Sequence, residues 1–292
     1  MTDYFETAIV SYQSFFYYLV SEITFTTTPW YLNYFWALSF ISLFVYILEL
    51  LFPWRKNQPK LRHDFFLDLF YMYFNFFIFK LLFFSSFGAV TKQFFLTFLG
   101  GNPSGLSVLN NSQLPYWLQI ILFFLLLDFV QWLTHIALHR YSFLWNFHKV
   151  HHSIKEMGFA GHLRYHWMEN VIYTPVKFLA ISLIGGFEPE NVFVLYYISI
   201  LIGHLNHSNT NITYGPLKYI FNNPVMHIWH HAESVPQKYS HGINFGISLS
   251  LWDYIFKTAY IEQSSRDIKL GFKGIESFPK SFLGQSIYPL KK

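Results

Sequence analysis

The stretch "HKVHHSIKEMGFAGHLRYH", residues 148–166, places five histidines within nineteen positions. It lies in a chain of 292 residues in which 53% of residues are hydrophobic and only 12% are charged. Soluble domains carry roughly 25% charged residues, so this chain has too little charge to cover a water-facing surface of its size. Lipid is therefore the expected solvent for much of the surface, and the histidine-rich stretch is the feature that needs an explanation.

The histidines recur at helical spacing. Thirteen of the fourteen lie between positions 135 and 241. On a helix, side chains three or four residues apart share one face, with Cβ atoms about 5–6 Å apart. Two imidazoles at that spacing can bind one metal ion at about 2.0–2.1 Å. The groups with this spacing are His135 and His139; His148, His151 and His152; His162 and His166; His204 and His207; and His227, His230 and His231.

Metal binding explains this pattern better than core filling does. A single pair of this kind is more often interfacial than a ligand pair, but the HxxHH unit occurs twice and is joined by further pairs. Buried imidazoles without partners are costly, and neighbouring imidazolium groups repel each other. A metal ion removes both problems because it binds the neutral ring. About nine or ten nitrogens exceed the capacity of one ion, so two metals are predicted, and a thiolate-free nitrogen site suits Fe, Zn, Cu or Ni.

Long apolar segments predict an all-α membrane protein. Residues 30–52, 65–88 and 115–139 each predict a helix long enough to cross a hydrocarbon core of about 30 Å. Residues 171–202 predict two shorter helices, a candidate re-entrant hairpin around "GGFEPEN", whereas residues 8–26 are too polar to assign as a span. We expect an integral membrane bundle of about four or more transmembrane or re-entrant helices with a cytosolic helical cap. The expected divisions are membrane helices and loops over 1–114, a histidine-bearing catalytic domain over 115–260 and a cytosolic tail over 261–292.

Basic residues predict the orientation. Cytoplasmic loops of membrane proteins are enriched in Lys and Arg. The loop after the first predicted span and the segment two crossings later are both basic, so both are expected in the cytoplasm. The residues are Arg55, Lys56, Lys60 and Arg62 in the first, and Arg140, Lys149, Lys155 and Arg164 in the second.

Composition excludes several classes of protein. The chain has no cysteine, which excludes disulfides, zinc ribbons and thiol catalysis. The net charge of +4 comes without a basic run interleaved with aromatics, so no nucleic-acid partner is expected. Three alternatives stay open: a bis-histidine membrane cytochrome, a non-enzymatic metal-binding or transport protein, and a zinc hydrolase.

The histidine motifs carry a family resemblance. The series "DFVQWLTHIALHR", "WNFHKVHHS", "HLRYHWMEN", "HLNHSN", "NNPVMHIWHH" and "NFGISLSLWDYIFKTAY" resembles the fatty acid hydroxylase / sterol desaturase superfamily of integral-membrane di-iron enzymes. It is also similar to the alkylglycerol monooxygenase-like branch. The resemblance covers roughly residues 115–260, with the histidine motifs in the family's order.

The resemblance implies a set of metal ligands. His166 lacks the proline that often follows it in the family, and His241 stands where the family often has an acid, so both are placed with His162 in a second tier. His63 is interpreted as structural. The implied ligands are His135, His139, His148, His151, His152, His207, His227, His230 and His231, with His204 as a tenth.

Three further residues have expected supporting roles. Asp128 lies two helical turns before His135 on the same face. It is expected to accept a hydrogen bond from a ligand's second ring nitrogen or to pair with Lys80. Trp252 and Asp253, in "LWDYIF", are expected to support the cap.

The resemblance also implies a function. Two non-haem Fe ions, with Zn as a substitute in purified protein, would use O2 and external electrons to hydroxylate or desaturate a fatty acyl, sterol or ether-lipid substrate. The sequence contains no GxGxxG fingerprint, haem-attachment motif or cysteine-based cluster site. Electrons are therefore expected from a separate donor, such as a ferredoxin, a cytochrome b5-like protein or a reductase.

Overall fold

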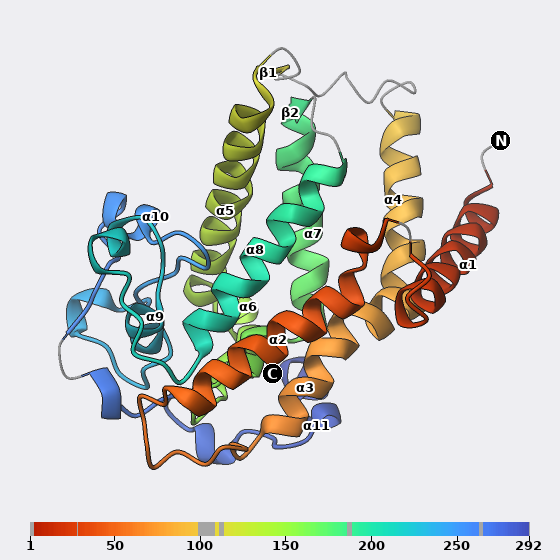
Figure 1. Cartoon of the computed structure of the whole chain (residues 1–292). Coiled ribbons are helices and arrows are strands. Elements are labelled where there is room, and N and C mark those ends of the chain that lie inside the picture. The colour runs from red at the N-terminus through yellow and green to blue at the C-terminus, as the bar shows by residue number, and fades with distance from the viewer. Residues whose placement is uncertain are drawn as a thin grey trace.

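The fold is helical, as predicted. The computed structural model describes residues 3–27, 29–98, 109–110, 114–185, 189–262 and 265–291. Within these ranges the extended structure, apart from isolated bridges, is a two-residue parallel pairing of β1 (Leu109–Asn110) with β2 (Ile184–Gly185) (Figure 1). The chain is therefore an all-α protein.

Three helical segments are long and apolar enough to cross a membrane. They are α2 (Tyr34–Leu51), Phe65–Phe83 and α5 (Tyr116–Arg140). They confirm the helices predicted over 30–52, 65–88 and 115–139. The second segment begins as α3 (Phe65–Tyr73) and continues through two π-helical stretches, Phe74–Ile78 and Lys80–Phe84, into α4 (Ser85–Phe98).

The N-terminal helix packs against this second segment. Helix α1 (Tyr4–Ile23) lies along α4 (Figure 1), with the Ser11 hydroxyl donating to the Ser85 carbonyl at 3.0 Å. Its last turn also stabilises the start of α2, because Glu22 is fully buried and accepts from the Phe35 backbone N–H at 2.7 Å. Glu22 therefore acts as a capping group at the start of a membrane helix.

The predicted helical pair over 171–202 is present. Helix α7 (Trp167–Leu183) packs on α5, and α8 (Pro189–His207) packs on α2. The "GGFEPEN" turn of the predicted re-entrant hairpin lies partly outside the described residues.

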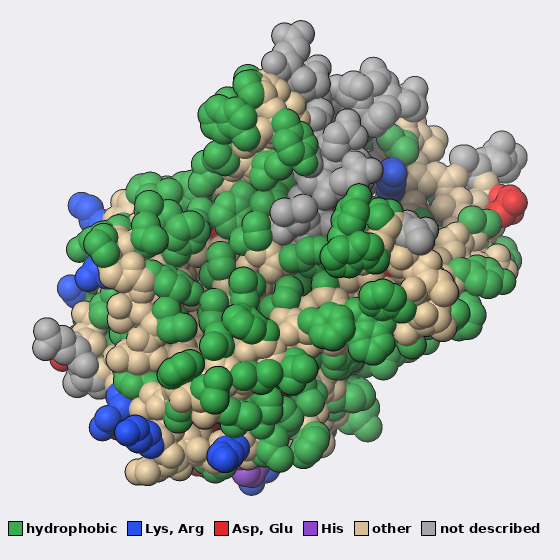
Figure 2. All heavy atoms as spheres, in the orientation of Figure 1, with side chains coloured by type: hydrophobic (Ala, Val, Ile, Leu, Met, Phe, Trp, Pro, Cys, Tyr) green, Lys and Arg blue, Asp and Glu red, His purple; other side chains and the backbone are tan. Residues whose placement is uncertain are grey.

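The remaining α-helices and η5 form the cap, most of which lies beside the lower ends of α5 and α8 in Figure 1, with α11 beside the lower end of α3. They are α6 (Ser142–His152), η5 (Phe159–Leu163), α9 (Pro224–His230), α10 (Leu251–Ile255) and α11 (Phe282–Ile287). In Figure 2 hydrophobic side chains cover most of the visible face, whereas Lys and Arg gather at its lower left, over the cap and the loop after α2. The positive charge thus collects at the end of the bundle that carries the cap.

Two buried carboxylates attach the cap to α5. Asp253 accepts from the Trp132 indole at 3.0 Å and from the backbone N–H groups of Phe245 and Gly246 at 2.9 and 2.8 Å. Asp128 accepts from the Trp252 indole at 3.0 Å and from the Ser248 backbone N–H at 3.1 Å. The supporting role expected for Trp252 and Asp253 is confirmed.

Both partners expected for Asp128 were wrong. Its oxygens accept from the cap backbone and an indole, and the ammonium of Lys80 instead lies 5.6 Å from the centre of the Phe76 ring. The reason is that a carboxylate buried at this depth is satisfied by the nearest N–H donors of the packed cap segment, which no spacing along α5 reveals.

Candidate metal centre

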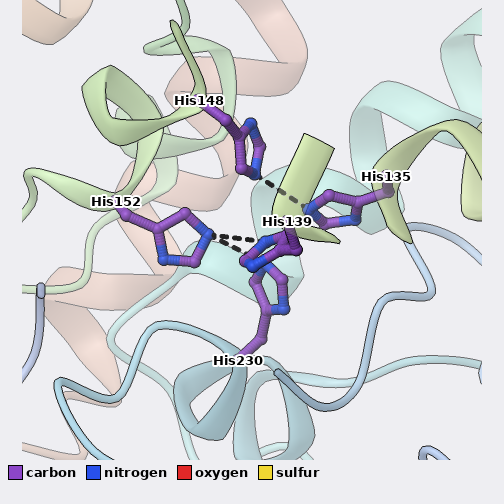
Figure 3. A group of neighbouring side chains, drawn as sticks. All are labelled: His135, His139, His148, His152 and His230. Atoms are coloured by element: carbon purple, nitrogen blue, oxygen red, sulfur yellow. Dashed lines mark hydrogen bonds between the residues drawn. The ribbon is translucent and has the colours of Figure 1, made fainter. Parts of the chain in front are cut away.

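Nine histidines converge into two groups. The five-histidine group consists of His135 and His139 from α5, His148 and His152 from α6, and His230 from α9, and their rings point toward one another in Figure 3. The four-histidine group consists of His151 from α6, His207 from α8, His227 from α9 and His231 just after it. Within each group the candidate ligand atoms lie within 4.8 Å of one another.

Each HxxHH unit contributes to both groups. In the first unit, His148 and His152 enter the five-histidine group and His151 enters the other. On a helix with about 100° per residue, positions four apart differ by about 40°, whereas adjacent positions differ by about 100°. The same rule places His227 and His231 together and sends His230 to the five-histidine group.

The histidine rings of each group approach one another closely through their Nε2 atoms, which point into the group. In the five-histidine group, the Nε2 atoms of His135 and His148 are 3.0 Å apart, and His152 Nε2 lies 3.1 Å from those of both His139 and His230.

The four-histidine group has the same arrangement. The Nε2 atoms of His207 and His227 are 3.0 Å apart, and His231 Nε2 lies 3.2 Å from each of them. His151 Nε2 is 3.4 Å from His207 Nε2. All four inward nitrogens are therefore close enough to share one ligand-binding position.

The outward Nδ1 atoms of four rings face backbone carbonyls. His135 Nδ1 lies 2.7 Å from the Phe245 carbonyl, and His230 Nδ1 lies 2.9 Å from the Ile243 carbonyl. The Nδ1 atoms of His151 and His207 are paired in the same way with the carbonyls of Arg164 and Gly203, at 3.1 and 2.8 Å.

These bonds determine the tautomer. A carbonyl only accepts, so each of these Nδ1 atoms carries the proton and the Nε2 lone pair points into the group. Lone pairs about 3 Å apart repel each other, whereas a cation between them is attracted to all of them. The donor set therefore fits a metal ion.

Burial keeps the rings neutral, as a ligand must be. Removal from water lowers the pKa of His151 to about 3. Burial, followed by repulsion from neighbouring imidazoles, holds the pKa values of His152, His230 and His231 well below the usual 6.5. At neutral pH the cap histidines are therefore unprotonated and able to bind a metal.

Glu169 is a site residue that sequence reasoning missed. It lies in the first turn of α7, is 3% exposed, and its Oε2 accepts from His148 Nδ1 at 3.1 Å. Its other carboxylate oxygen is buried and has no hydrogen-bond partner among the residues that the structure describes. Neither residue's position in the sequence indicated this contact, because α7 reaches His148 only through tertiary packing.

Aromatic rings enclose the five-histidine group. Phe245 is 2% exposed and its ring centre lies 5.1 Å from that of His139. The Trp145 ring lies 5.0 Å from His139 and 5.1 Å from His152. These side chains exclude water from one side of the group.

The other candidate histidines lie outside both groups. His204 is fully buried, with Nε2 3.0 Å from the Ser42 hydroxyl and Nδ1 3.0 Å from His162 Nδ1. His166 Nε2 lies 3.0 Å from the Ser286 carbonyl, so this ring faces the C-terminal segment. His241 is exposed, as is His63, which contacts Asp64.

The two groups adjoin. The ring centres of His152 and His231, which belong to different groups, are 4.5 Å apart, and those of His227 and His230 are 5.1 Å apart. The fold and site together define a membrane helical bundle with a candidate binuclear histidine centre at one end.

Comparison with known proteins supports the family resemblance. The family model described as "Fatty acid hydroxylase" matches residues 120–258, a range that contains all nine grouped histidines. The matched range is just under half of the chain, and the resemblance stated from the motifs is confirmed.

Curated relatives agree with this assignment. The chain is 27% identical over 182 residues to the ornithine lipid hydroxylase OlsE of Rhizobium tropici. This alignment covers 62% of this chain and 53% of that protein. It is 29% identical to the alkylglycerol monooxygenases of Caenorhabditis elegans and Homo sapiens, over 47% and 46% of this chain and 26% and 29% of those proteins. The chain thus spans about half of the first relative and just over a quarter of the other two. No solved structure matches it.

Proposed function

We propose that the protein is a membrane-bound, non-haem di-iron oxygenase that hydroxylates a lipid with O2 and electrons from a separate donor. The observation that carries the proposal is the convergence of nine Nε2 atoms into two adjoining groups. Five histidines would hold one ion and four would hold the other. Iron bound there would supply the activation of O2 that breaking an unactivated C–H bond requires.

The protein's own residues orient and shield the site. The carbonyls of Phe245 and Ile243 fix the rings of His135 and His230, so these ligands do not need to reorganise when a metal binds. Glu169 fixes His148, and its carboxylate would supply a negative charge beside a bound metal. Phe245 and Trp145 exclude water, which protects a reactive oxidant from unproductive reduction.

The reaction requires external electrons. Hydroxylation converts R–H, O2, two electrons and two protons into R–OH and water. A soluble or membrane-bound electron carrier is therefore part of the proposal, and a ferredoxin, a cytochrome b5-like protein and a reductase are the candidate classes. Basic side chains at the cap end support a cytoplasmic location for the centre.

The proposed substrate is a polar lipid with a long alkyl chain. Two ligands, His135 and His139, lie on the candidate spanning helix α5, and that helix exposes apolar side chains such as Leu133, 53% exposed, to the bilayer. An alkyl chain in the membrane can therefore approach the centre without crossing water. The names of the relatives, an ornithine lipid hydroxylase and alkylglycerol monooxygenases, suggest aminoacyl lipids and ether lipids as the first substrates to test.

The test combines metal analysis with isotope transfer. Protein purified anaerobically and reconstituted with ⁵⁷Fe is expected to hold two irons per chain and to show a coupled Mössbauer signal. With a reductant and ornithine lipid or alkylglycerol, ¹⁸O from ¹⁸O2 is expected in the product. A zinc-loaded enzyme that is active without O2 and incorporates oxygen from water would contradict the proposal and favour a hydrolase.

A further inference from the structure

A polar cavity lies next to the candidate metal centre but is separate from it. Its volume is about 320 Å³, at the lower end of the range for small-molecule sites. It forms where the loop after α2, the turn after α6 and the C-terminal segment meet. Nothing in the proposed oxygenase function uses it.

Charged side chains of both signs line the cavity. The charged lining residues comprise the cations Arg62, Lys155, Arg164 and Lys280 and the carboxylates Asp64 and Glu156. Arg62 and Arg164 are 5% and 1% exposed, whereas Lys155 and Lys280 are exposed to solvent. The two arginines therefore form a buried base. The two lysines lie at the accessible rim, where the Lys155 ammonium donates to the Glu276 carboxylate at 2.7 Å.

The buried arginines are incompletely satisfied. Both share one carboxylate, Asp68: Arg62 pairs with it, and Arg164 Nη1 lies 3.0 Å from it and 2.8 Å from Asp64. Arg164 Nε is buried without a hydrogen-bond partner among the described residues. A buried guanidinium N–H without an acceptor is costly, and an anionic oxygen in the cavity would satisfy it.

The cavity lies at the level of the membrane surface. Asp64 immediately precedes Phe65, the first residue of a candidate spanning segment. Basic pockets at this level, between membrane helices on the cytoplasmic side, are typical sites for anionic lipid headgroups.

An apolar surface adjoins the cavity. Helix α11 begins two residues after Lys280 and exposes Leu283 and Ile287, 69% and 46% exposed. The Phe282 ring on this helix lies 4.6 Å from that of Phe74, which belongs to the spanning segment, and Phe66 on α3 is 73% exposed. The segment predicted as a cytosolic tail is therefore packed against a candidate membrane helix.

We propose that this cavity binds the phosphate headgroup of an anionic membrane lipid. The headgroup enters past Lys155 and Lys280 and accepts hydrogen bonds from the guanidinium groups at the base. The acyl chains lie along the apolar surface that α3 and α11 present to the bilayer.

An occupied cavity would stabilise the histidine segments. The Arg164 carbonyl accepts from His151 Nδ1, and Ser153 in the cavity wall directly follows His152. A lipid that holds these residues would therefore slow the loss of metal from both groups. This effect needs no turnover, so it can be tested whether or not the oxygenase proposal is correct.

The test measures lipid binding by native mass spectrometry of the full-length, metal-loaded protein. The probe is phosphatidylglycerol, compared with phosphatidylcholine and with inorganic phosphate alone. We expect one tightly retained phosphatidylglycerol per chain. In Lys155→Gln/Lys280→Gln we expect about 30-fold weaker binding, since each basic residue near an anionic lipid contributes roughly a factor of five.

The control is Lys218→Gln, a half-buried lysine outside the cavity, which should leave the affinity unchanged. Equal retention of phosphatidylcholine, or equal loss in the control, would overturn the proposal. If inorganic phosphate alone binds as tightly as the lipid, the assignment to a membrane lipid is overturned. The cavity would then be a site for a soluble anion.

Discussion

The two histidine groups draw on the same cap helices but differ in how their rings are supported. In the five-histidine group, one ring contacts a buried carboxylate, Glu169, and two others are fixed by carbonyls of the 243–245 segment. The four-histidine group has no carboxylate contact of this kind among the described residues. His227 Nδ1 faces the amide nitrogen of Asn222 at 3.3 Å, and His231 Nδ1 is buried without a partner in the described part of the chain.

This difference indicates that the two metal positions are not equivalent. A carboxylate behind a histidine raises the basicity of the ring and offsets the charge of the metal. We therefore expect the five-histidine group to hold its ion more tightly, and the four-histidine group to lose its ion first when a chelator is added.

The largest expected effect is the loss of one metal ion when a single ligand is replaced. Two neighbouring histidines allow each group to be tested separately. His151→Ala should deplete the four-histidine group and His152→Ala the five-histidine group, although the two residues are neighbours on α6. Each variant should retain about one metal per chain by elemental analysis and lose detectable oxygenase activity, since a missing ligand removes the binuclear site. Identical spectra for the ion that remains in the two variants would show that the groups are not separate.

The next effect is the pH dependence of the metal-free protein. Burial lowers the pKa of His151 from 6.5 to about 3, and those of the other cap ligands also fall. At a pH between the lowered pKa of the folded protein and the pKa of 6.5 in the unfolded chain, the unfolded chain binds protons that the folded protein does not. Stability is therefore retained above about pH 6.5 and decreases as the pH falls toward 3, by about 1.4 kcal/mol per pH unit for each such histidine.

Denaturant unfolding of chelator-treated protein in detergent at pH 7.5 and 5.5 would measure this effect. His63→Gln is the matched control, because this exposed ring lies outside both groups and should leave the pH profile unchanged. A free energy of unfolding that does not change between the two pH values would contradict the conclusion that the grouped histidines are buried and neutral.

A third effect concerns the attachment of the cap. Asp253→Ala removes the acceptor of the Trp132, Phe245 and Gly246 N–H groups. We expect a loss of about 3 kcal/mol in stability, because three buried donors lose their partner. Thermal unfolding measures it, and the exposed Asp267→Ala is the control; a shift no larger than the control's would show that Asp253 does not hold the cap.

A fourth and smaller effect tests the asymmetry directly. Glu169→Gln retains an oxygen that can accept from His148 but removes the charge. Metal affinity of the five-histidine group should fall by about 10- to 100-fold, as is typical when such outer partners are changed. Chelator-driven metal release, followed separately for the two ions, should show no change for the four-histidine group; equal acceleration of both would argue for a general loss of stability.

The smallest effect is expected at His204, the tenth ligand implied by the resemblance. Its ring contacts Ser42 and His162 rather than either group. His204→Gln should therefore keep two metals per chain. Loss of one metal, measured beside a Ser42→Ala control that disturbs the same contact, would restore His204 to the ligand set.

The sequence by itself predicted the helices, a candidate metal site built from histidines and the family resemblance. Hydropathy and the three- and four-residue spacing of the histidines are local properties, and a helix converts them directly into apolar faces and ligand faces. The sequence alone therefore predicted the long helices α2 and α5 and the ligand faces of the two HxxHH units.

Only the tertiary structure decided how the histidines divide and what supports them. The His148–Glu169 contact spans 21 positions, the Asp128–Trp252 bond spans 124, and the division between His151 and His152 depends on where α5, α8 and α9 lie around α6. The same holds for the C-terminal segment, in which Phe282 packs on Phe70 and Tyr71 of α3. These contacts arise when distant segments pack together and satisfy buried polar groups. The spacing of residues along the chain does not indicate which segments come into contact.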